Sequence, residues 1–127
     1  MDYFEIKKKL PKGVNLLAVS KGFMSSDIEY IKSLGQIDFG ESKVQEAMTK
    51  TVFQSNNNIN WHFIGRIQTN KIRKIVENFD FIHSVDSYKK LLKVSQVAIE
   101  LKKMPKVFIQ IKLANDPGKA GLLYSEL

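Results

Sequence analysis

Short apolar runs alternate with longer amphipathic segments along most of the chain. The runs have the length of buried strands, and they predict five of them. The predicted strands cover residues 14–20, 37–40, 60–64, 79–83 and 106–113. Because these segments are apolar at most positions, we expect a parallel sheet that is covered on both faces.

The segments between the predicted strands carry apolar residues every three or four positions, which is typical of helices that bury one face. Four such stripes occur: Ile28 and Ile31; Val44, Ala47, Met48, Thr51 and Val52; Ile72, Ile75, Val76 and Phe79; and Tyr88, Leu91, Leu92, Ser95, Ala98 and Ile99. A further short helix is predicted over residues 3–10, before the first strand.

Boundary residues agree with these elements. Two pairs have the spacing of a capping box, Ser26 with Glu29 and Ser42 with Gln45. The other signals are Gly35 as the end of the first amphipathic helix, Asp86 or Ser87 as the cap of the fourth, and Pro105 just beyond its end. Residues 55–58 have the composition of a loop.

Strands and helices that alternate in this way predict right-handed βαβ units. Two α/β architectures fit five units: an open doubly wound sheet, and part of a (β/α)8 barrel. A whole barrel needs about 250 residues, so the pattern alone fits the open sheet. Residues 121–127, however, have the pattern of a helix that is only beginning, which favours a barrel interrupted partway.

Composition limits the function classes. The 127 residues fit one domain, and hydrophobic residues make up 43% of them. The absence of cysteine excludes disulfides, thiolate metal sites and a cysteine nucleophile. No apolar run is long enough for a transmembrane helix, and the first residues lack the pattern of a secretory signal. We therefore expect a cytoplasmic protein without a membrane partner.

The net charge of +7 raises the question of nucleic-acid binding. The lysines are spread along the chain in short groups, and Arg66 and Arg73 are the only arginines. No basic segment interleaved with aromatic residues, as in RNA-binding modules, is present. We interpret the charge as a solvated lysine-rich surface, and we do not expect a nucleic-acid partner.

Lys21 is the most informative single residue because it directly follows the first predicted strand. Parallel α/β folds place their chemistry at that end of their strands. A Schiff base forms from a neutral amine, and only about one ordinary lysine in ~2,500 is neutral at pH 7. Apolar pocket walls favour the neutral form, so a reactive lysine is expected in such a pocket. The alternative is a solvated lysine at a strand end.

Polar residues also follow the next three predicted strands, in segments 38–42, 61–71 and 83–87. No glycine-rich phosphate loop of the dinucleotide or Walker type occurs. With two histidines and no HExxH or paired acidic cluster, no metal site is expected.

Together these segments resemble the pyridoxal phosphate homeostasis proteins. The resemblance is carried by Leu-Leu-Ala-Val-Ser-Lys at 16–21, Asp-Phe-Gly-Glu at 38–41, Val-Gln-Glu at 44–46, Trp-His-Phe-Ile-Gly at 61–65 with Gln68, Asn70 and Lys71, and His-Ser-Val-Asp-Ser at 83–87. The stretch from 109–111 through 119–121 resembles the family's fifth strand and the loop after it.

The resemblance implies an α/β fold: a partial (β/α)8 TIM barrel like the N-terminal domain of alanine racemase, with about the first five βα units. Residues 1–127 would be an incomplete domain that binds pyridoxal 5′-phosphate (PLP) as a Schiff base on Lys21. The implied cofactor-binding residues are Lys21, Ser42, His62, Ile64, Gly65 and His83, within a wall formed by 40–42, 62–66 and 83–84. Members of the family are regarded as PLP carriers or regulators without established turnover.

The chain also departs from the family pattern. Ser42 stands where the family usually has asparagine, Lys112 also replaces an asparagine, and Arg66 occupies a variable position. The family's phosphate-binding serines, and the arginine that faces the pyridine nitrogen, belong to its last strands, which have no counterpart here.

Structural alternatives remain for several site residues. His62 and His83 are equally consistent with buried histidines that are satisfied by hydrogen bonds. Ser42 and Asp86 fit helix caps, and Trp61 fits core packing. Two other functions also remain open: a fragment of a PLP-dependent racemase-like enzyme, and a small basic α/β module that binds RNA. If the barrel is interrupted, its exposed edge strands are expected to promote self-association.

Overall fold

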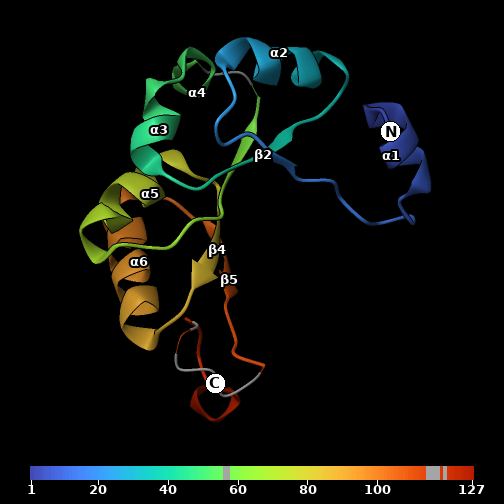
Figure 1. Cartoon of the computed structure of the whole chain (residues 1–127). Coiled ribbons are helices and arrows are strands. Elements are labelled where there is room, and N and C mark those ends of the chain that lie inside the picture. The colour runs from blue at the N-terminus through green and yellow to red at the C-terminus, as the bar shows by residue number, and fades with distance from the viewer. Residues whose placement is uncertain (56–57, 114–117, 119) are drawn as a thin grey trace.

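Five parallel strands form one sheet in the order β1-β2-β3-β4-β5 in the computed structural model of the chain (Figure 1). The structure describes residues 1–55, 58–113, 118 and 120–127. The strands are β1 (Ala18–Val19), β2 (Asp38–Glu41), β3 (Asn60–Phe63), β4 (Phe81–Val85) and β5 (Lys106–Ile109). Each strand pairs in parallel with the strand before it, which is the arrangement of consecutive βα units in a barrel wall.

Helices follow each of the first four strands. These are α2 (Ser25–Ser33), α3 (Val44–Thr49), α4 (Thr51–Gln54), α5 (Ile72–Asn78) and α6 (Tyr88–Leu101), with a 3-10 turn η1 (Thr69–Lys71) before α5. Helix α1 (Tyr3–Lys9) precedes β1, and the 3-10 turn η2 (Tyr124–Glu126) follows β5. Helices α2 to α6 lie on one side of the sheet, and α1 stands apart from them (Figure 1). The Tyr3 hydroxyl of α1 donates to Gln36 Oε1 at 3.1 Å, which ties this helix to the start of β2.

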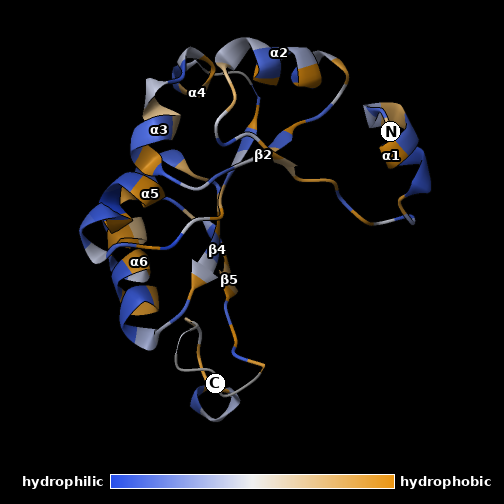
Figure 2. Cartoon of the chain, viewed as in Figure 1, coloured by the Kyte–Doolittle hydropathy of each residue, from blue (hydrophilic) through white to orange (hydrophobic). Residues whose placement is uncertain are grey.

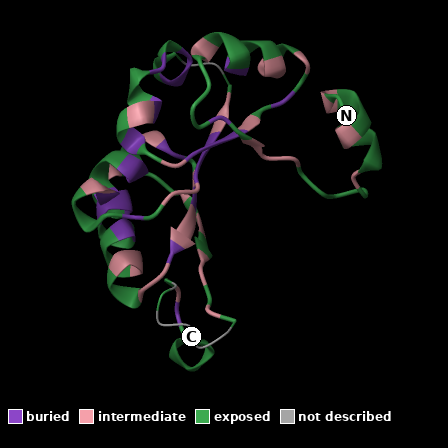
Figure 3. Ribbon diagram, viewed as in Figure 1, coloured by how far each residue is buried: buried purple, intermediate pink, exposed green. Residues whose placement is uncertain are grey.

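The hydrophobic core lies between the sheet and helices α2 to α6. Phe39, Trp61 and Ile82 point outward from the strands and are almost fully buried. They pack against buried helix residues that include Ile28, Ala47, Val52, Ile72, Ile75, Val76, Val94 and Val97. In Figure 2 the apolar positions of these helices turn toward the sheet, and in Figure 3 the buried residues gather at the same interface.

The opposite face of the sheet, which we call the inner face, is not covered by helices. One row of it runs across all five strands through Val19, Gly40, His62, Phe81 and Lys106, because these residues are aligned in register. Val19 is 46% exposed, and Phe108 on β5 is 52% exposed. The prediction that both faces are covered is therefore wrong for this chain: only the outer face has a packed layer.

The first strand is much shorter than the predicted 14–20. Only Ala18 and Val19 form it, because the carbonyl of Leu16 accepts a hydrogen bond from the Gln36 side-chain amide at 2.6 Å instead of a strand partner. The other four strands lie within two residues of their predicted starts, although β5 ends at Ile109 rather than at Leu113.

The second predicted helix is two helices. α3 ends and α4 begins on either side of Lys50, whose backbone is extended (φ −84°, ψ 126°). The apolar stripe predicted across this break is nevertheless partly confirmed, since Val44, Ala47 and Val52 are buried.

The predicted face of α6 is only partly correct: Ala98 is buried and Leu91 packs against the core, as predicted. Tyr88 and Ile99 are 70% and 75% exposed, whereas Val94 and Val97 are buried. The helix carries more apolar residues than one face needs, so helical spacing fits two overlapping stripes.

The helix caps match in part. Gly35 follows the end of α2 with a φ of 109°, and Ser87 caps α6 by accepting from the Lys90 N–H at 3.2 Å, as predicted. Neither predicted capping box forms. Helix α2 begins at Ser25 with Asp27 accepting from the Met24 N–H at 3.0 Å, and α3 has no side-chain cap.

The C-terminal segment is not the start of a long helix. Leu122 forms an isolated parallel bridge with Ile111, and only one 3-10 turn follows, at Tyr124–Glu126. Residues 56, 57, 114–117 and 119, which belong to a predicted loop and to the family resemblance, lie outside the described residues. Among the described helices, none is long and apolar enough to cross a bilayer.

Candidate functional site

Lys21 lies in a tight turn at the carboxyl end of β1. The Phe23 N–H donates to the Ser20 carbonyl at 3.0 Å, which closes a four-residue turn. Gly22 at the third position has a φ of 78°, the left-handed value that a type II turn requires there. The turn therefore places Lys21 at its second position, directly above the sheet edge, and makes glycine at position 22 a backbone requirement.

The Lys21 side chain is exposed, and within the described residues it makes no hydrogen bond or ion pair. The expectation of an apolar pocket around it is wrong for this chain. The reason is the open inner face: the first strand has no neighbour on its other edge among the described residues, so no wall faces the turn from that side.

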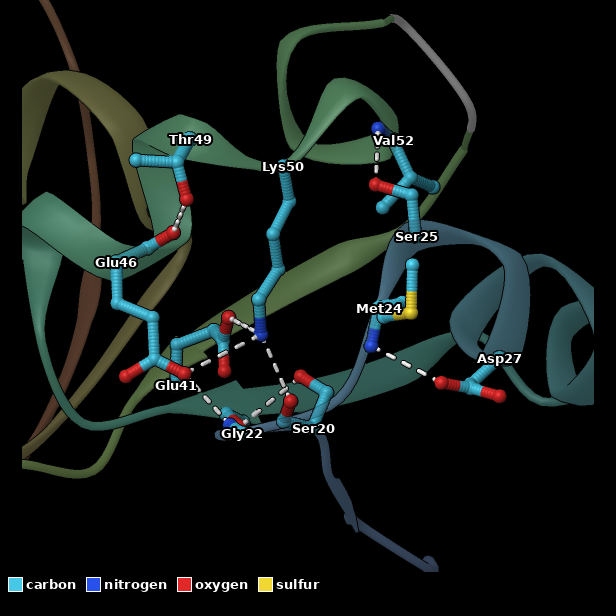
Figure 4. Close-up of polar contacts among 11 residues, drawn as sticks. Ser20, Gly22, Met24, Ser25, Asp27, Glu41, Glu46, Thr49, Lys50 and Val52 are labelled. Carbon is cyan, nitrogen blue, oxygen red and sulfur yellow. Dashed lines mark hydrogen bonds and ion pairs between the residues drawn. The ribbon is translucent and has the colours of Figure 1, made fainter.

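A buried ion pair lies beside the turn (Figure 4). The Lys50 ammonium is 2.5 Å from Glu41 Oε1 and donates to the Ser20 carbonyl at 2.8 Å. Glu41 is 1% exposed and Lys50 is 7% exposed. The second Glu41 oxygen has no hydrogen-bond partner among the described residues, so Lys50 provides the main compensation for a buried negative charge.

Glu46 of α3 completes this cluster. Its Oε1 accepts from the Gly22 N–H at 2.6 Å and lies 3.8 Å from the Lys50 ammonium. The sequence analysis did not single out Lys50 or Glu46 as functional. Glu46 belongs to a segment that carries the family resemblance, but no role was assigned to it there. Glu46 and Lys50 also form an i,i+4 pair of opposite charges, which usually marks a solvent-exposed helix surface.

A second polar group crosses the inner face. Asp38 Oδ1 is 2.8 Å from His62 Nε2, and His62 Nδ1 is 2.8 Å from His83 Nε2. Since the carboxylate only accepts, His62 Nε2 carries the proton, and a neutral His62 then accepts from His83 Nε2–H at Nδ1. In this series of hydrogen bonds, the Nδ1 lone pair of His83 is the acceptor that remains unused.

The two histidine rings are held by aromatic contacts as well. His62 stacks on Phe81 with ring centroids 4.0 Å apart, and His83 lies against Phe108 at 4.6 Å. Burial, followed by the electrostatic effect of neighbouring His62, lowers the pKa of His83 from its ordinary value of 6.5. These histidines are therefore satisfied by one another, as the structural alternative expected, and only His83 keeps an open nitrogen.

The loops after β2 and β3 meet at Ser42 and Gly65. A Cβ at position 65 would lie 1.9 Å from the Ser42 carbonyl oxygen, so glycine is required by the close approach of the two backbones. Ile64 next to it donates its N–H to the Glu41 carbonyl at 2.9 Å.

A cleft of about 440 Å3 opens beside this contact. Its lining includes Ser42, Lys43, Gly65, Arg66, Gln68 and Lys71. Three of these residues are basic, so the described wall of the cleft favours anions.

The structure thus brings the predicted site residues together in pairs. Ser42 contacts Gly65, and His62 bonds to His83, whereas within the described residues no hydrogen bond links Lys21 to any of them. All six lie at or near the carboxyl ends of β1 to β4. Among the described residues no group of three histidine or acidic residues is arranged to hold a metal ion.

The fold and the strand-end position of these groups define part of a (β/α)8 barrel of the alanine racemase type. The chain superposes on alanine racemase of Clostridium difficile 630 with a TM-score of 0.66 at 14% identity, over 85% of this chain and 29% of that one. This similarity shows the fold alone.

Two solved structures of PipY from Synechococcus elongatus PCC7942 are much more similar. The structure without PLP gives a TM-score of 0.88 at 42% identity, over 94% of this chain and 56% of that chain. The structure with PLP bound gives 0.89 at 39% identity, over 98% and 57%.

The sequence comparison names the family. The pyridoxal phosphate homeostasis protein of Synechocystis sp. PCC 6803 is 48% identical over 126 residues, which are 98% of this chain and 58% of that protein. The homologue of the same name from Pasteurella multocida is 35% identical over 94% of this chain and 52% of its own length. No family model matches the chain. These similarities confirm the resemblance to the pyridoxal phosphate homeostasis proteins, and the chain spans little more than half the length of these relatives.

Proposed function

We propose that this chain carries the cofactor-attachment part of a PLP homeostasis protein, with Lys21 as the residue that forms the Schiff base. The observation that carries the proposal is the position of Lys21 in a fixed turn at the end of β1, with an amine that has no competing partner among the described residues. The similarity to a PipY structure with PLP bound supports the choice of cofactor.

The residues around the turn fit this role. The other lysine at the same strand end, Lys50, is buried and paired with Glu41, so its amine is engaged, whereas the Lys21 amine is accessible. When bound, PLP supplies an aldehyde carbon and an electron-accepting ring. The neutral Lys21 amine attacks that carbon, a C=N bond forms, and the aldehyde oxygen leaves as water with the two amine protons.

The other predicted site residues are proposed as the wall on one side of the ring. Ser42 and Gly65 border the loops above the sheet, and Ile64 lies beside Gly40 on the inner face. His83 offers its Nδ1 atom as a hydrogen-bond acceptor, while His62 holds His83 in place from Asp38. In this proposal His62 acts through His83 and does not itself contact the ring.

Labelling with PLP and borohydride tests the proposal. We expect the chain with added PLP to develop an imine absorbance band, and borohydride to fix the label mainly on Lys21 in a peptide map. Lys21→Ala should lose that band, whereas Lys50→Arg, which keeps the buried cation, should retain it. Label spread evenly over the surface lysines would contradict the proposal.

A test with amino acids separates the carrier from an enzyme. The racemase-like alternative requires turnover of an amino acid by the PLP-loaded chain, and the carrier does not. We expect no racemisation of alanine above the rate of free PLP.

A further inference from the structure

The backbone on either side of Lys21 is fixed by side chains of the segment that follows β2 (Figure 4). Before Lys21, the Ser20 carbonyl accepts from the Lys50 ammonium at 2.8 Å. After it, the Gly22 N–H donates to the Glu46 carboxylate at 2.6 Å. Lys21 therefore lies between two peptide groups that are held by charged partners, although its own side chain makes no hydrogen bond or ion pair with the residues that the structure describes.

The side chains that hold the turn are themselves held. The Lys50 ammonium lies between Glu41 and Glu46, at 2.5 Å and 3.8 Å from their Oε1 atoms. Glu41 belongs to β2, and its carboxylate is buried in the sheet edge, so the cluster has a rigid base. Glu46 is the outermost member, with 36% of its side chain exposed, and it reaches the turn from helix α3.

When the backbone of a lysine is already fixed, less conformational freedom is lost as its amine reacts. A hydrogen bond from a backbone N–H to a carboxylate is about twice as strong as a neutral one. Without the bond to Glu46, the peptide unit after Lys21 loses its partner, and the turn gains alternative conformations that point the amine elsewhere. With it, only the rotatable bonds of the side chain must be restricted.

We propose that Glu46 is a positioning residue for Lys21: it holds the Gly22 N–H and thereby sets the direction in which Lys21 leaves the end of β1. The inference rests on the proposed function, because it concerns the reaction of the Lys21 amine with the aldehyde of PLP. Glu46 acts through the backbone and does not contact the cofactor.

Three variants of the full chain test this role. Glu46→Met removes the acceptor but keeps the stem and a good helix former. Glu46→Gln keeps an amide oxygen that can accept from Gly22. Glu100→Met is the matched control, because Glu100 is an exposed helix carboxylate whose partner is Arg73 on the surface.

Two measurements are made on each variant: hydrogen exchange of the peptide that contains Gly22, and the fraction of borohydride-fixed PLP found on Lys21. For Glu46→Met we expect faster exchange at Gly22 and a loss of Lys21 labelling of about tenfold, the equivalent of one charge-assisted hydrogen bond. Glu46→Gln keeps a neutral hydrogen bond of about half the strength, so it should restore part of both signals, and Glu100→Met should change neither.

The outcomes separate the two proposals. If the unmodified chain shows no preference for Lys21, the proposed function fails, and the role of Glu46 falls with it. If the unmodified chain labels Lys21 and Glu46→Met labels it equally well, only the role of Glu46 is overturned. If Glu46→Gln loses as much as Glu46→Met, the charge of Glu46 rather than its bond to Gly22 matters, and the positioning role is again overturned.

Discussion

Two lysines at the end of β1 have opposite surroundings, which gives them opposite roles. Lys21 is exposed and without a polar partner among the described residues, whereas Lys50 is 7% exposed and lies against Glu41, which is 1% exposed. A buried charge that loses its partner is strongly destabilising, so we assign Lys50 to the integrity of the strand ends.

Lys50→Met should therefore lower the free energy of unfolding by about 3–5 kcal/mol, because it leaves the Glu41 carboxylate buried and uncompensated. Urea denaturation followed by circular dichroism measures the change. Arg73→Met is the matched control: its pair with Glu100 is more than half exposed, so a loss of about 0–1 kcal/mol is expected. Equal losses in the two variants would contradict the assignment.

His83 should make stability depend on pH. Its folded pKa is lowered by burial and by His62, whereas the unfolded chain has the ordinary value near 6.5. Below that value the unfolded state binds more protons than the folded state, so this contribution to stability is complete above pH 6.5 and is lost as the pH falls through the folded pKa.

NMR titration of the histidine C–H signals measures the shift directly, with His83→Gln for assignment. We expect the His83 signal to titrate below 6.5, and the acid side of the stability curve to flatten in His83→Gln. A His83 titration at or above 6.5 would be inconsistent with its partly buried contact with His62.

At the level of elements, the β2 and β3 loops are joined by a backbone contact that only glycine permits. In Gly65→Ala the new methyl group would meet the Ser42 backbone at 1.9 Å, so the two loops must separate. We expect a loss of about 1–3 kcal/mol in thermal or urea unfolding. In Gly40→Ala the nearest atom is the flexible end of Ile64 at 3.2 Å, and a smaller loss is expected. The reverse order would mean that the loops do not meet as described.

The buried residues of an element could be predicted where its sequence has a single apolar face. The stripe of α5 that contains Ile72 and Ile75 was predicted from spacing, and both residues are buried. Trp61, for which core packing was the structural alternative, is also buried. Spacing failed in part on α6, where apolar residues exceed the area of one face and the choice between overlapping stripes depends on the neighbouring helix.

For the candidate site, the sequence predicted only that its residues lie at the ends of neighbouring strands. Parallel topology requires that Lys21, Ser42, Gly65 and His83 lie at the same edge of the sheet. The anchoring of Lys21 by Glu46 was not predictable, because it depends on a helix break at Lys50 that no proline or glycine marks. A lysine that turns inward at such a break has the same sequence pattern as a surface ion pair.

At the level of the whole molecule, the sheet has two edges and one open face. Val19 on β1 and Phe108 on β5 are each about half exposed, and both edge strands offer backbone groups for pairing. In a closed barrel this surface would be covered. At roughly 25 cal/mol per Å2, about 200–600 Å2 of uncovered apolar surface would offset a typical total stability of about 5–15 kcal/mol.

We therefore predict that the isolated chain self-associates or is only partly ordered. Sedimentation over a range of concentrations, combined with thermal unfolding, checks this, and Phe108→Lys should weaken the association by placing a charge on the inner face. A monodisperse monomer that melts cooperatively would refute the prediction and would mean that the open sheet is stable by itself.

The length of the chain also bears on ligand choice. It spans 58% of the Synechocystis relative, and the family resemblance assigns the phosphate-binding serines to the last strands. We expect the chain to distinguish poorly between pyridoxal and pyridoxal phosphate in the labelling assay, because the phosphate contributes much of the binding of this cofactor. A strong preference for the phosphorylated form would instead implicate the basic cleft that contains Arg66 and Lys71.

The sequential strand order has a consequence for how this polypeptide is made. Each strand pairs with the one synthesised just before it, so no pairing waits for a distant part of the chain. As the ribosome adds about 5–20 residues per second, each new βα unit can dock on a template that has already emerged. The first strand to appear carries the turn of Lys21, but Glu46 and Lys50 follow more than twenty residues later. The Lys21 side chain is thus exposed to solvent for about a second or more before Glu46 and Lys50 can hold its turn.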